Sequence, residues 1–263
     1  MHTIQIFNNI AVQGLEKFPQ THYHISKDAS NPNAILLRSH NLHNMHISET
    51  LQAVARAGAG VNNVPVEQLS NRGVPVFNTP GANANAVKEL VIAGMLIACR
   101  NIHTALQYTR ELSHSDPAIV KQRVEQDKKQ FAGFELPEKT LAVIGLGAIG
   151  VQVANAALAL GMKVIGFDPA ITIERAWQLN AGAVQASDMT TAMANADFIT
   201  LHVPYSEKTH HLMNQAALKL CKKSAVLLNF ARGEIVDQQA MVSALANNEL
   251  QTYVCDFPSA ELL

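Results

Sequence analysis

A glycine-rich phrase set between two apolar segments constrains the fold of this chain more than any other feature of its sequence. The phrase Gly145-Leu146-Gly147-Ala148-Ile149-Gly150 follows the apolar segment Leu141–Ile144 and leads into the amphipathic stretch Val151–Leu160. A second apolar segment, Lys163–Phe167, then ends at Asp168. A strand, a glycine turn, a helix and a second strand ending in an acidic residue are typical of a βαβ unit that binds a dinucleotide. A glycine-rich turn in another kind of α/β fold is the alternative.

The residues of this phrase have separate physical roles in such a site. Gly145 permits the tight turn, Gly147 lets the backbone approach a pyrophosphate, and Gly150 lets the helix pack closely on the strand. The helix N-terminus offers free N–H groups to the anion. Asp168 would accept hydrogen bonds from the ribose hydroxyls and repel a 2′-phosphate, and no Arg or Lys occupies the next few positions. The sequence therefore predicts NAD rather than NADP as the cofactor.

Polar residues also follow three later strand candidates, at the edge where open α/β sheets bind their ligands. They form the phrases His202-Val203-Pro204, Asn229-Phe230-Ala231-Arg232-Gly233 and Asp256-Phe257-Pro258. A guanidinium at such a strand end, as in Arg232, is suited to holding a substrate carboxylate by two hydrogen bonds. On spacing alone, the commoner role of such an arginine is a surface cap or an ion-pair partner.

Apolar and polar segments alternate in two series, which predicts two α/β domains. Residues 1–82 read as βα units around a parallel sheet, and residues 139–263 suit a doubly wound mononucleotide-binding domain. Residues 83–138 are expected to form connecting helices, with one helix from about Ala84 to Tyr108 and a break at His114-Ser115-Asp116-Pro117. The strand candidates are Thr3–Phe7, Tyr23–Ile25, Ala34–Leu37, Ala53–Arg56 and Val74–Phe77, then Thr140–Ile144, Lys163–Phe167, Ala183–Val184, Ala196–Leu201, Ser224–Leu228 and Gln251–Cys255.

The composition excludes several classes of protein. Of the 263 residues, 48% are hydrophobic and 16% charged, which excludes a disordered chain and leaves enough apolar material for a sizeable core. The net charge of −1 gives no global attraction for nucleic acid or for an anionic membrane, so a small-molecule site is expected. The longest apolar run, Leu90–Cys99, is shorter than the about 20 residues that span a bilayer.

Neither a disulfide framework nor a metal site is predicted. The 3 cysteines are scattered and form no CxxC pair, which is typical of reduced core cysteines and predicts a cytoplasmic protein. His40, His43 and His46 are regularly spaced, but no cysteine or carboxylate completes a ligand set before Glu49. Solvated histidines are therefore expected there.

A set of phrases, in order along the chain, resembles the D-2-hydroxyacid dehydrogenase family, and most closely its D-3-phosphoglycerate dehydrogenase branch. They are Leu37-Arg38-Ser39, Arg56–Asn63, Asn78–Asn83, Val87–Leu90, Phe131–Leu136, Val143–Gly150, His202–Pro204, Asn229–Asp237 and Asp256–Pro258. The resemblance runs from end to end of the chain. It implies a flavodoxin-like N-terminal substrate domain followed by a doubly wound Rossmann domain that binds NAD.

The resemblance also implies an activity and assigns residues to it. The activity is hydride transfer between NAD and a small 2-hydroxy acid, here oxidation of 3-phosphoglycerate to 3-phosphohydroxypyruvate at the start of serine biosynthesis. Arg232 is similar to the arginine that anchors the substrate carboxylate beside the cofactor, and Arg38, Ser39 and Asn83 match positions that face the substrate. The matches to cofactor contacts are Gly145, Gly147, Ala148, Ile149, Gly150, Asp168, His202, Pro204, Thr209, Phe230, Ala231, Arg232 and Asp256.

Two departures from the family pattern concern the C-terminal part. The family pairs a proton-accepting histidine, in a Pro-His-(Leu/Ile)-Gly phrase, with a glutamate. The sequence ends at Leu263 before such a phrase, while Glu261 stands at the spacing from Asp256 that is usual for the catalytic glutamate. The segment that returns to complete the first domain is also absent. We therefore expect a C-terminally truncated chain that binds NAD but turns over 3-phosphoglycerate poorly or not at all.

Two alternatives stay open. Another D-2-hydroxyacid dehydrogenase, acting on hydroxypyruvate, glyoxylate or lactate, would carry the same phrases. So would a catalytically silent NAD-binding interaction module. Because family architecture places dimer contacts on the nucleotide domain, a homodimer formed through the NAD-binding domain is expected.

Overall fold

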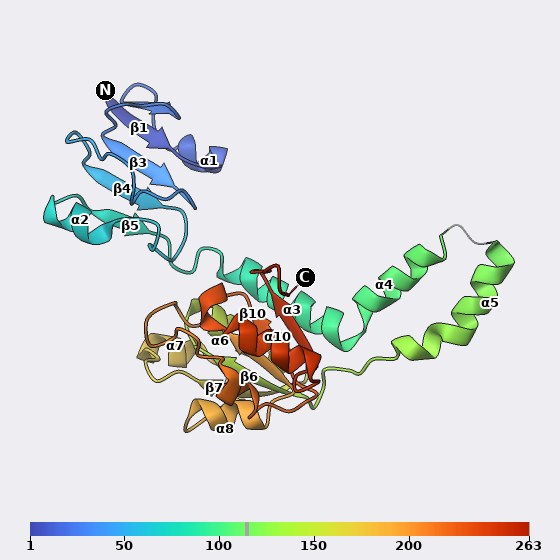
Figure 1. Ribbon diagram of the computed structural model, residues 1–263. Helices are drawn as coiled ribbons and strands as arrows, with labels where there is room; N and C mark the ends of the chain where they lie inside the picture. Colours follow the sequence, from blue (N-terminus) through green and yellow to red (C-terminus); the bar gives the residue numbers. More distant parts are fainter. Residues whose placement is uncertain (114–115, 263) are drawn as a thin grey trace. The chain divides into compact units, whose positions relative to one another are not determined.

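The computed structural model describes residues 1–113 and 116–262, so His114 and Ser115 of the predicted break lie outside the described residues. The chain divides into two compact units, Met1–Asn83 and Ala84–Leu263 (Figure 1). Each unit is built around a parallel sheet of its own.

The first unit contains a five-stranded sheet in the order β2-β1-β3-β4-β5. This is the flavodoxin-like strand order, as expected. Its elements are β1 (His2–Ile6), α1 (Val12–Leu15), β2 (Tyr23–Ser26), β3 (Ala34–Leu37), β4 (Ala53–Arg56), α2 (Val66–Asn71) and β5 (Val76–Asn78). Side chains of β3, β4 and α2 form the core, among them Leu37, Val54 and Leu69, which are fully buried.

The last strand of this sheet begins later than the sequence predicts. Val74 does not pair with β4, because its N–H donates to the Leu69 carbonyl and closes the end of α2. Pro75 has no N–H, and its carbonyl accepts from the Val54 N–H. The register with β4 therefore starts at Val76.

The second unit contains a six-stranded sheet in the order β11-β10-β9-β6-β7-β8. Counted within the unit, this is the doubly wound order, which confirms the predicted Rossmann fold. The order reverses between β6 and β9, which pair directly. The elements are β6 (Thr140–Ile144), α6 (Ala148–Ala159), β7 (Lys163–Phe167), α7 (Ile173–Gln178), β8 (Ala183–Gln185), α8 (Met189–Ala194), β9 (Phe198–Leu201), α9 (Gln215–Leu218), β10 (Val226–Asn229), η2 (Gly233–Ile235), α10 (Gln238–Ala246) and β11 (Thr252–Cys255).

Two hydrophobic clusters cover the two faces of this sheet. In β6, Leu141 and Val143 belong to the cluster that includes α6, while Ala142 and Ile144 belong to the cluster that includes α8 and α10. Because both faces are covered, the strand is a continuous apolar run rather than an alternating one. The unit also contains α3 (Ala84–Cys99), which packs against α6, β10 and β11, and then α4 (Ile102–Glu111), α5 (Pro117–Asp127) and η1 (Lys128–Phe131).

The prediction of one helix over Ala84–Tyr108 is wrong, because two helices with a bend of 63° occupy that segment. Asn101 lies between them with a left-handed φ of 51°, and its side-chain amide donates to the Ala132 carbonyl. The Cys99 carbonyl accepts from the Phe134 N–H. These contacts with a segment distant in sequence end α3 at Cys99. Among the described residues no single helix is long and apolar enough to cross a membrane, and only the bent pair α3 and α4 meets both criteria together.

Candidate active site

The glycine phrase forms the turn between β6 and α6 at the carboxyl end of the sheet. Gly145 has a φ of +94°, and a Cβ there would lie 2.7 Å from the His202 carbonyl oxygen. A Cβ at Gly150 would lie 1.9 Å from the Gly145 carbonyl oxygen, so any side chain would displace the backbone. At Gly147, by contrast, a Cβ would meet nothing within 4 Å. The packing of the protein itself therefore requires the first and third glycines, while the second borders open space.

The space beside Gly147 fits an anionic pyrophosphate. Gly147 is the N-cap residue of α6, and no side chain caps this helix end. The first N–H groups of the helix, at Ala148 and Ile149, therefore lack a side-chain acceptor at the positive end of the helix dipole. These are the properties that allow a helix N-terminus to bind phosphate groups.

Asp168 lies directly after β7 and contacts the glycine turn. Its Oδ2 accepts from the Leu146 N–H at 2.8 Å, and its Oδ1 accepts from the Ala170 N–H at 2.8 Å. Each carboxylate oxygen keeps a lone pair, so Asp168 can accept from ribose hydroxyls while it is held in place. The structure thus brings Asp168 and the glycine phrase together at one edge of the sheet.

The segment after β9 carries His202, Pro204 and Thr209. The His202 N–H donates to the Ile144 carbonyl at 2.7 Å, which extends the pairing of β9 with β6. The imidazole lies 3.0 Å from the hydroxyl of the buried Thr200, and burial lowers the pKa of His202 to about 4. The ring is therefore neutral at pH 7. The Thr209 hydroxyl donates to the Pro204 carbonyl at 2.7 Å, which holds the loop in a compact shape.

Arg232 follows β10 in a loop whose backbone is fixed by a buried amide. Asn229, the last residue of β10, is 0% exposed. Its Oδ1 accepts from the Ala231 N–H at 3.1 Å, and its Nδ2 donates to the Arg232 carbonyl at 2.8 Å. Arg232 is half-buried, its guanidinium donates to the Ala231 carbonyl, and Phe230 packs on the cluster that includes α6. The loop places a cation at the edge of the sheet where ligands of such folds bind.

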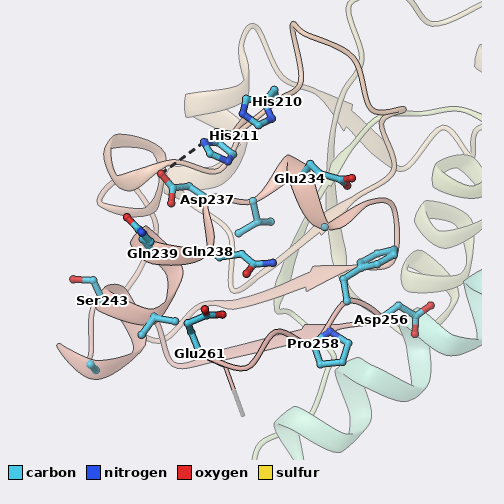
Figure 2. A pocket seen from close by; sticks show the side chains of 15 residues that line it. His210, His211, Glu234, Asp237, Gln238, Gln239, Ser243, Asp256, Pro258 and Glu261 are labelled. Atoms are coloured by element: carbon cyan, nitrogen blue, oxygen red, sulfur yellow. Dashed lines mark ion pairs between the residues drawn. The ribbon is translucent and has the colours of Figure 1, made fainter. Parts of the chain in front are cut away.

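A cleft of about 1240 Å³ is lined by α10, by the residues before it and by the segment after β11 (Figure 2). Asp256 and Glu261 line it, together with His211 and Asp237, whose Nδ1 and Oδ2 atoms lie 3.9 Å apart. The neighbouring Ser259 side chain lowers the pKa of Glu261. Arg232 is not among the described residues that line this cleft, so the cleft does not unite the two residues expected to be catalytic.

Arg38, Ser39 and Asn83 belong to the first unit, and all three are exposed. The N–H groups of Arg38, Ser39 and His40 donate to Asn8 Oδ1 at 3.3, 2.9 and 2.8 Å. The turn after β3 is therefore held by a side chain that follows β1. Asn83 is the last residue of the unit.

The sequence patterns assign no role to Asn8, Thr200 or Tyr253, yet these side chains fix the loops at the strand ends. The Tyr253 hydroxyl lies 3.2 Å from Asn229 Nδ2. A polar residue inside or directly after an apolar strand is the only signal that points to them. Among the described residues no group of three or more His, Cys, Asp or Glu side chains could hold a metal ion.

Comparisons with known proteins identify the family of this chain. The family model for the NAD binding domain of D-isomer specific 2-hydroxyacid dehydrogenases matches residues 93–263. The chain therefore belongs to the D-isomer specific 2-hydroxyacid dehydrogenase family. Its cofactor is NAD, as the sequence predicts.

Two curated relatives differ in name and in length. D-3-phosphoglycerate dehydrogenase of Methanocaldococcus jannaschii is 41% identical over 209 residues, which cover 80% of this chain and 37% of the relative. Hydroxypyruvate reductase of Thermotoga maritima is 36% identical over 202 residues, which cover 77% of this chain and 60% of the relative. The chain thus spans less than two thirds of the length of both relatives.

A solved structure shares the fold along nearly the whole chain. D-lactate dehydrogenase of Aquifex aeolicus, complexed with NAD and lactic acid, has a TM-score of 0.75 and 22% sequence identity. The match covers 98% of this chain and 77% of that one. It shows that both proteins combine the same two α/β units.

Proposed function

We propose that this protein is an NAD-dependent oxidoreductase that interconverts a D-2-hydroxy acid and its 2-oxo acid, with 3-phosphoglycerate as the hydroxy acid. The observation that carries the proposal is the fixed loop that holds Arg232 at the same sheet edge as the NAD-binding turn. A guanidinium there is suited to bidentate binding of a substrate carboxylate. The product would be 3-phosphohydroxypyruvate, which assigns the reaction to serine biosynthesis.

In this proposal each group of residues has one task. NAD, when bound, supplies the hydride acceptor. The glycine turn and Asp168 hold the nucleotide, and Arg232 holds the substrate carboxylate, which limits the orientations of the acid. Arg38, Ser39 and Asn83 contact the rest of the substrate. In the family a histidine takes the hydroxyl proton and a glutamate stabilises its protonated form, and we assign the role of that glutamate to Glu261 by resemblance. Glu261→Gln should then shift the pH profile of kcat, and an unchanged profile would remove Glu261 from the mechanism.

The relatives support two substrates. Three D-3-phosphoglycerate dehydrogenases with 41%, 36% and 34% identity favour the phosphorylated hydroxy acid. The hydroxypyruvate reductase with 36% identity favours a second candidate, in which the oxo acid is unphosphorylated. The first candidate needs a cation for the phosphate, and Arg38 is proposed for that task.

The test measures NAD binding and turnover on one preparation of the full chain. Turnover is followed by NADH absorbance, which rises when NAD is supplied with the hydroxy acids 3-phosphoglycerate and D-lactate and falls when NADH is supplied with the oxo acids glyoxylate and hydroxypyruvate. We expect slow turnover, with the highest kcat/KM for 3-phosphoglycerate and a selective loss with that substrate in Arg38→Gln. A higher kcat/KM with another of these acids would contradict the assigned substrate, and NAD binding without turnover of any of them would support a binding module.

Arg232→Gln tests the carboxylate anchor. Loss of the charged partner of the substrate carboxylate should lower kcat/KM by about 100-fold or more, with NAD affinity much less affected. Arg175→Gln is the matched control, because Arg175 is a half-buried arginine of α7 whose guanidinium donates to the Gln178 side chain. Equal effects of the two substitutions would contradict the assignment.

We also infer that the chain forms a homodimer through its second unit. Large apolar side chains stay exposed along α3, α4 and α5, and such patches mark interaction surfaces. They are Leu90, Leu96, Ile97, Ile102, Leu106 and Ile119, each between 39% and 50% exposed. Light scattering should give twice the chain mass of 28.5 kDa. Leu106→Glu should give a monomer. Val184→Glu is the control, because it changes an exposed residue of β8 and should leave the dimer intact. A monomeric wild-type chain would contradict the inference.

A cytoplasmic location is proposed on the state of the cysteines. Cys99, Cys221 and Cys255 are free thiols, which suits a reducing compartment. Fractionation of cells that produce the protein from its own gene tests this location.

A further inference from the structure

The amide of Asn229 is a fully buried polar group at the carboxyl edge of the second sheet. Asn229 is 0% exposed, and it lies in register between Leu201 of β9 and Cys255 of β11. A buried amide is costly unless its donors and acceptor are satisfied. Both N–H bonds of Asn229 are used, one on the Arg232 carbonyl at 2.8 Å and one on the Tyr253 hydroxyl at 3.2 Å. Its oxygen accepts from the Ala231 N–H at 3.1 Å.

These partners fix which way the amide points. The oxygen faces an N–H group at Ala231, and the nitrogen faces a carbonyl at Arg232. A rotated amide would place two donors together and two acceptors together, so only one orientation satisfies the loop. An aspartate at this position would turn a carboxylate oxygen toward the Arg232 carbonyl. The position therefore specifies an amide rather than any small polar residue.

Tyr253 completes the set from the neighbouring strand. It lies opposite Leu227 in the register of β10 and β11, on the same face as Asn229. Burial raises the pKa of the Tyr253 hydroxyl, so the hydroxyl stays protonated over the working pH range. The contact joins the loop after β10 to β11, and the backbone of that loop carries Arg232.

We propose that Asn229 and Tyr253 are positioning residues for Arg232: the buried amide, held by the tyrosine hydroxyl, sets the backbone from which the guanidinium reaches the substrate carboxylate. The inference rests on the proposed function of Arg232. Neither side chain touches substrate or cofactor in this account. Their effect on the reaction passes through the loop of residues 230–232.

Tyr253→Phe is the test variant, because it removes one hydroxyl and keeps the packed ring. We expect kcat/KM for 3-phosphoglycerate to fall about tenfold, the effect of one lost hydrogen bond, with the NAD Kd unchanged within twofold. Asn229→Asp should lower kcat/KM further. Tyr205→Phe is the matched control, since Tyr205 is an exposed tyrosine of the same unit. A Tyr253→Phe chain with wild-type kcat/KM would overturn the inference.

A double-mutant cycle separates positioning from a general structural role. If Tyr253 acts through Arg232, Tyr253→Phe should have no further effect on kcat/KM in an Arg232→Lys chain. Additive losses would overturn the inference.

Backbone NMR keeps the inference testable if the wild-type chain turns over no 2-hydroxy acid, a result that would refute the proposed function. In that case Tyr253→Phe should still shift the amide signals of Ala231 and Arg232 and lower the affinity of the NADH-bound chain for oxalate, a carboxylate probe. Unshifted signals or an unchanged oxalate affinity would overturn the inference in turn.

Discussion

The turn after β6 and the loop after β10 lie at the same edge of one sheet, and they are fixed by different physical means. The turn after β6 depends on the lack of side chains, because Gly145 and Gly150 leave room for backbone carbonyls. The loop after β10 depends on a side chain, because the amide of Asn229 satisfies two backbone groups of the loop. Steric overlap rises steeply with each added atom, whereas single hydrogen bonds contribute in small steps. Substitutions should therefore act abruptly at the turn and gradually at the loop.

The largest effect is expected for Gly150→Ala. The new Cβ would lie 1.9 Å from the Gly145 carbonyl oxygen, so helix and strand must separate. We expect about 2–4 kcal/mol lower stability by chemical denaturation and no measurable NAD binding. Gly147→Ala is the control, because its Cβ meets nothing within 4 Å, and it should fold normally while binding NAD weakly. Equal stability of the two variants would contradict the steric role given to Gly150 in the turn.

A smaller effect, confined to binding, is expected for Asp168→Asn. The substitution removes the charge that accepts from the Leu146 and Ala170 N–H groups and repels a 2′-phosphate. The NAD Kd should rise about 10–100-fold, and the preference for NAD over NADP should narrow. Calorimetric titration with both nucleotides measures this. An unchanged ratio of the two affinities would show that Asp168 does not select the cofactor.

His202 should make stability depend on pH without contributing a charge to the site. Burial holds the pKa of His202 at about 4, below the about 6.5 of an unfolded chain, so the unfolded state binds more protons between these values. Stability should therefore fall as the pH drops through that window. Between pH 7 and 4.5 the free energy of unfolding of the wild-type chain should fall by about 1–3 kcal/mol more than that of His202→Gln. Urea unfolding at the two pH values measures this difference. Parallel pH curves for the two chains would contradict the buried, neutral ring.

The smallest effect is expected for Asp197→Asn, at the amino end of β6 and β9. Burial alone would raise the pKa of Asp197, but hydrogen bonds from Lys222 and from the Thr140 N–H lower it overall. Asp197→Asn should lower the free energy of unfolding by about 1 kcal/mol or less at pH 7, because Asp197 is partly exposed. This difference should disappear as the pH falls below about 4 and through the lowered pKa of the folded state, because the carboxyl then becomes protonated. The NAD Kd should not change. A weakened NAD affinity would show that the two ends of the sheet are coupled.

The sequence predicts those parts of the molecule that depend on neighbours along the chain. The glycine phrase, the strand before it and Asp168 form one local unit, so their roles and the Rossmann fold can be inferred from spacing. The bend at Asn101 depends on contacts with Ala132 and Phe134, which no local pattern contains.

The support of the candidate site is equally nonlocal. Tyr253 reaches Asn229 across two strands that are separated by α10 along the chain. The spacing of Glu261 from Asp256 resembles the family pattern, but the structure places both in a cleft that Arg232 does not line. Sequence spacing therefore identified residue types at this edge and not the contacts among them.

The alternation of side chains along β6 has a practical consequence for anyone who wishes to modify this protein. Leu141 and Val143 share no cluster with Ala142 and Ile144, although all four are consecutive. Substitution energies are coupled most strongly between residues with common partners, so changes within one face of the strand should be coupled more strongly than changes on opposite faces. Four adjacent codons thus belong to two different packing layers, and a library can vary one layer first and adjust the other afterwards.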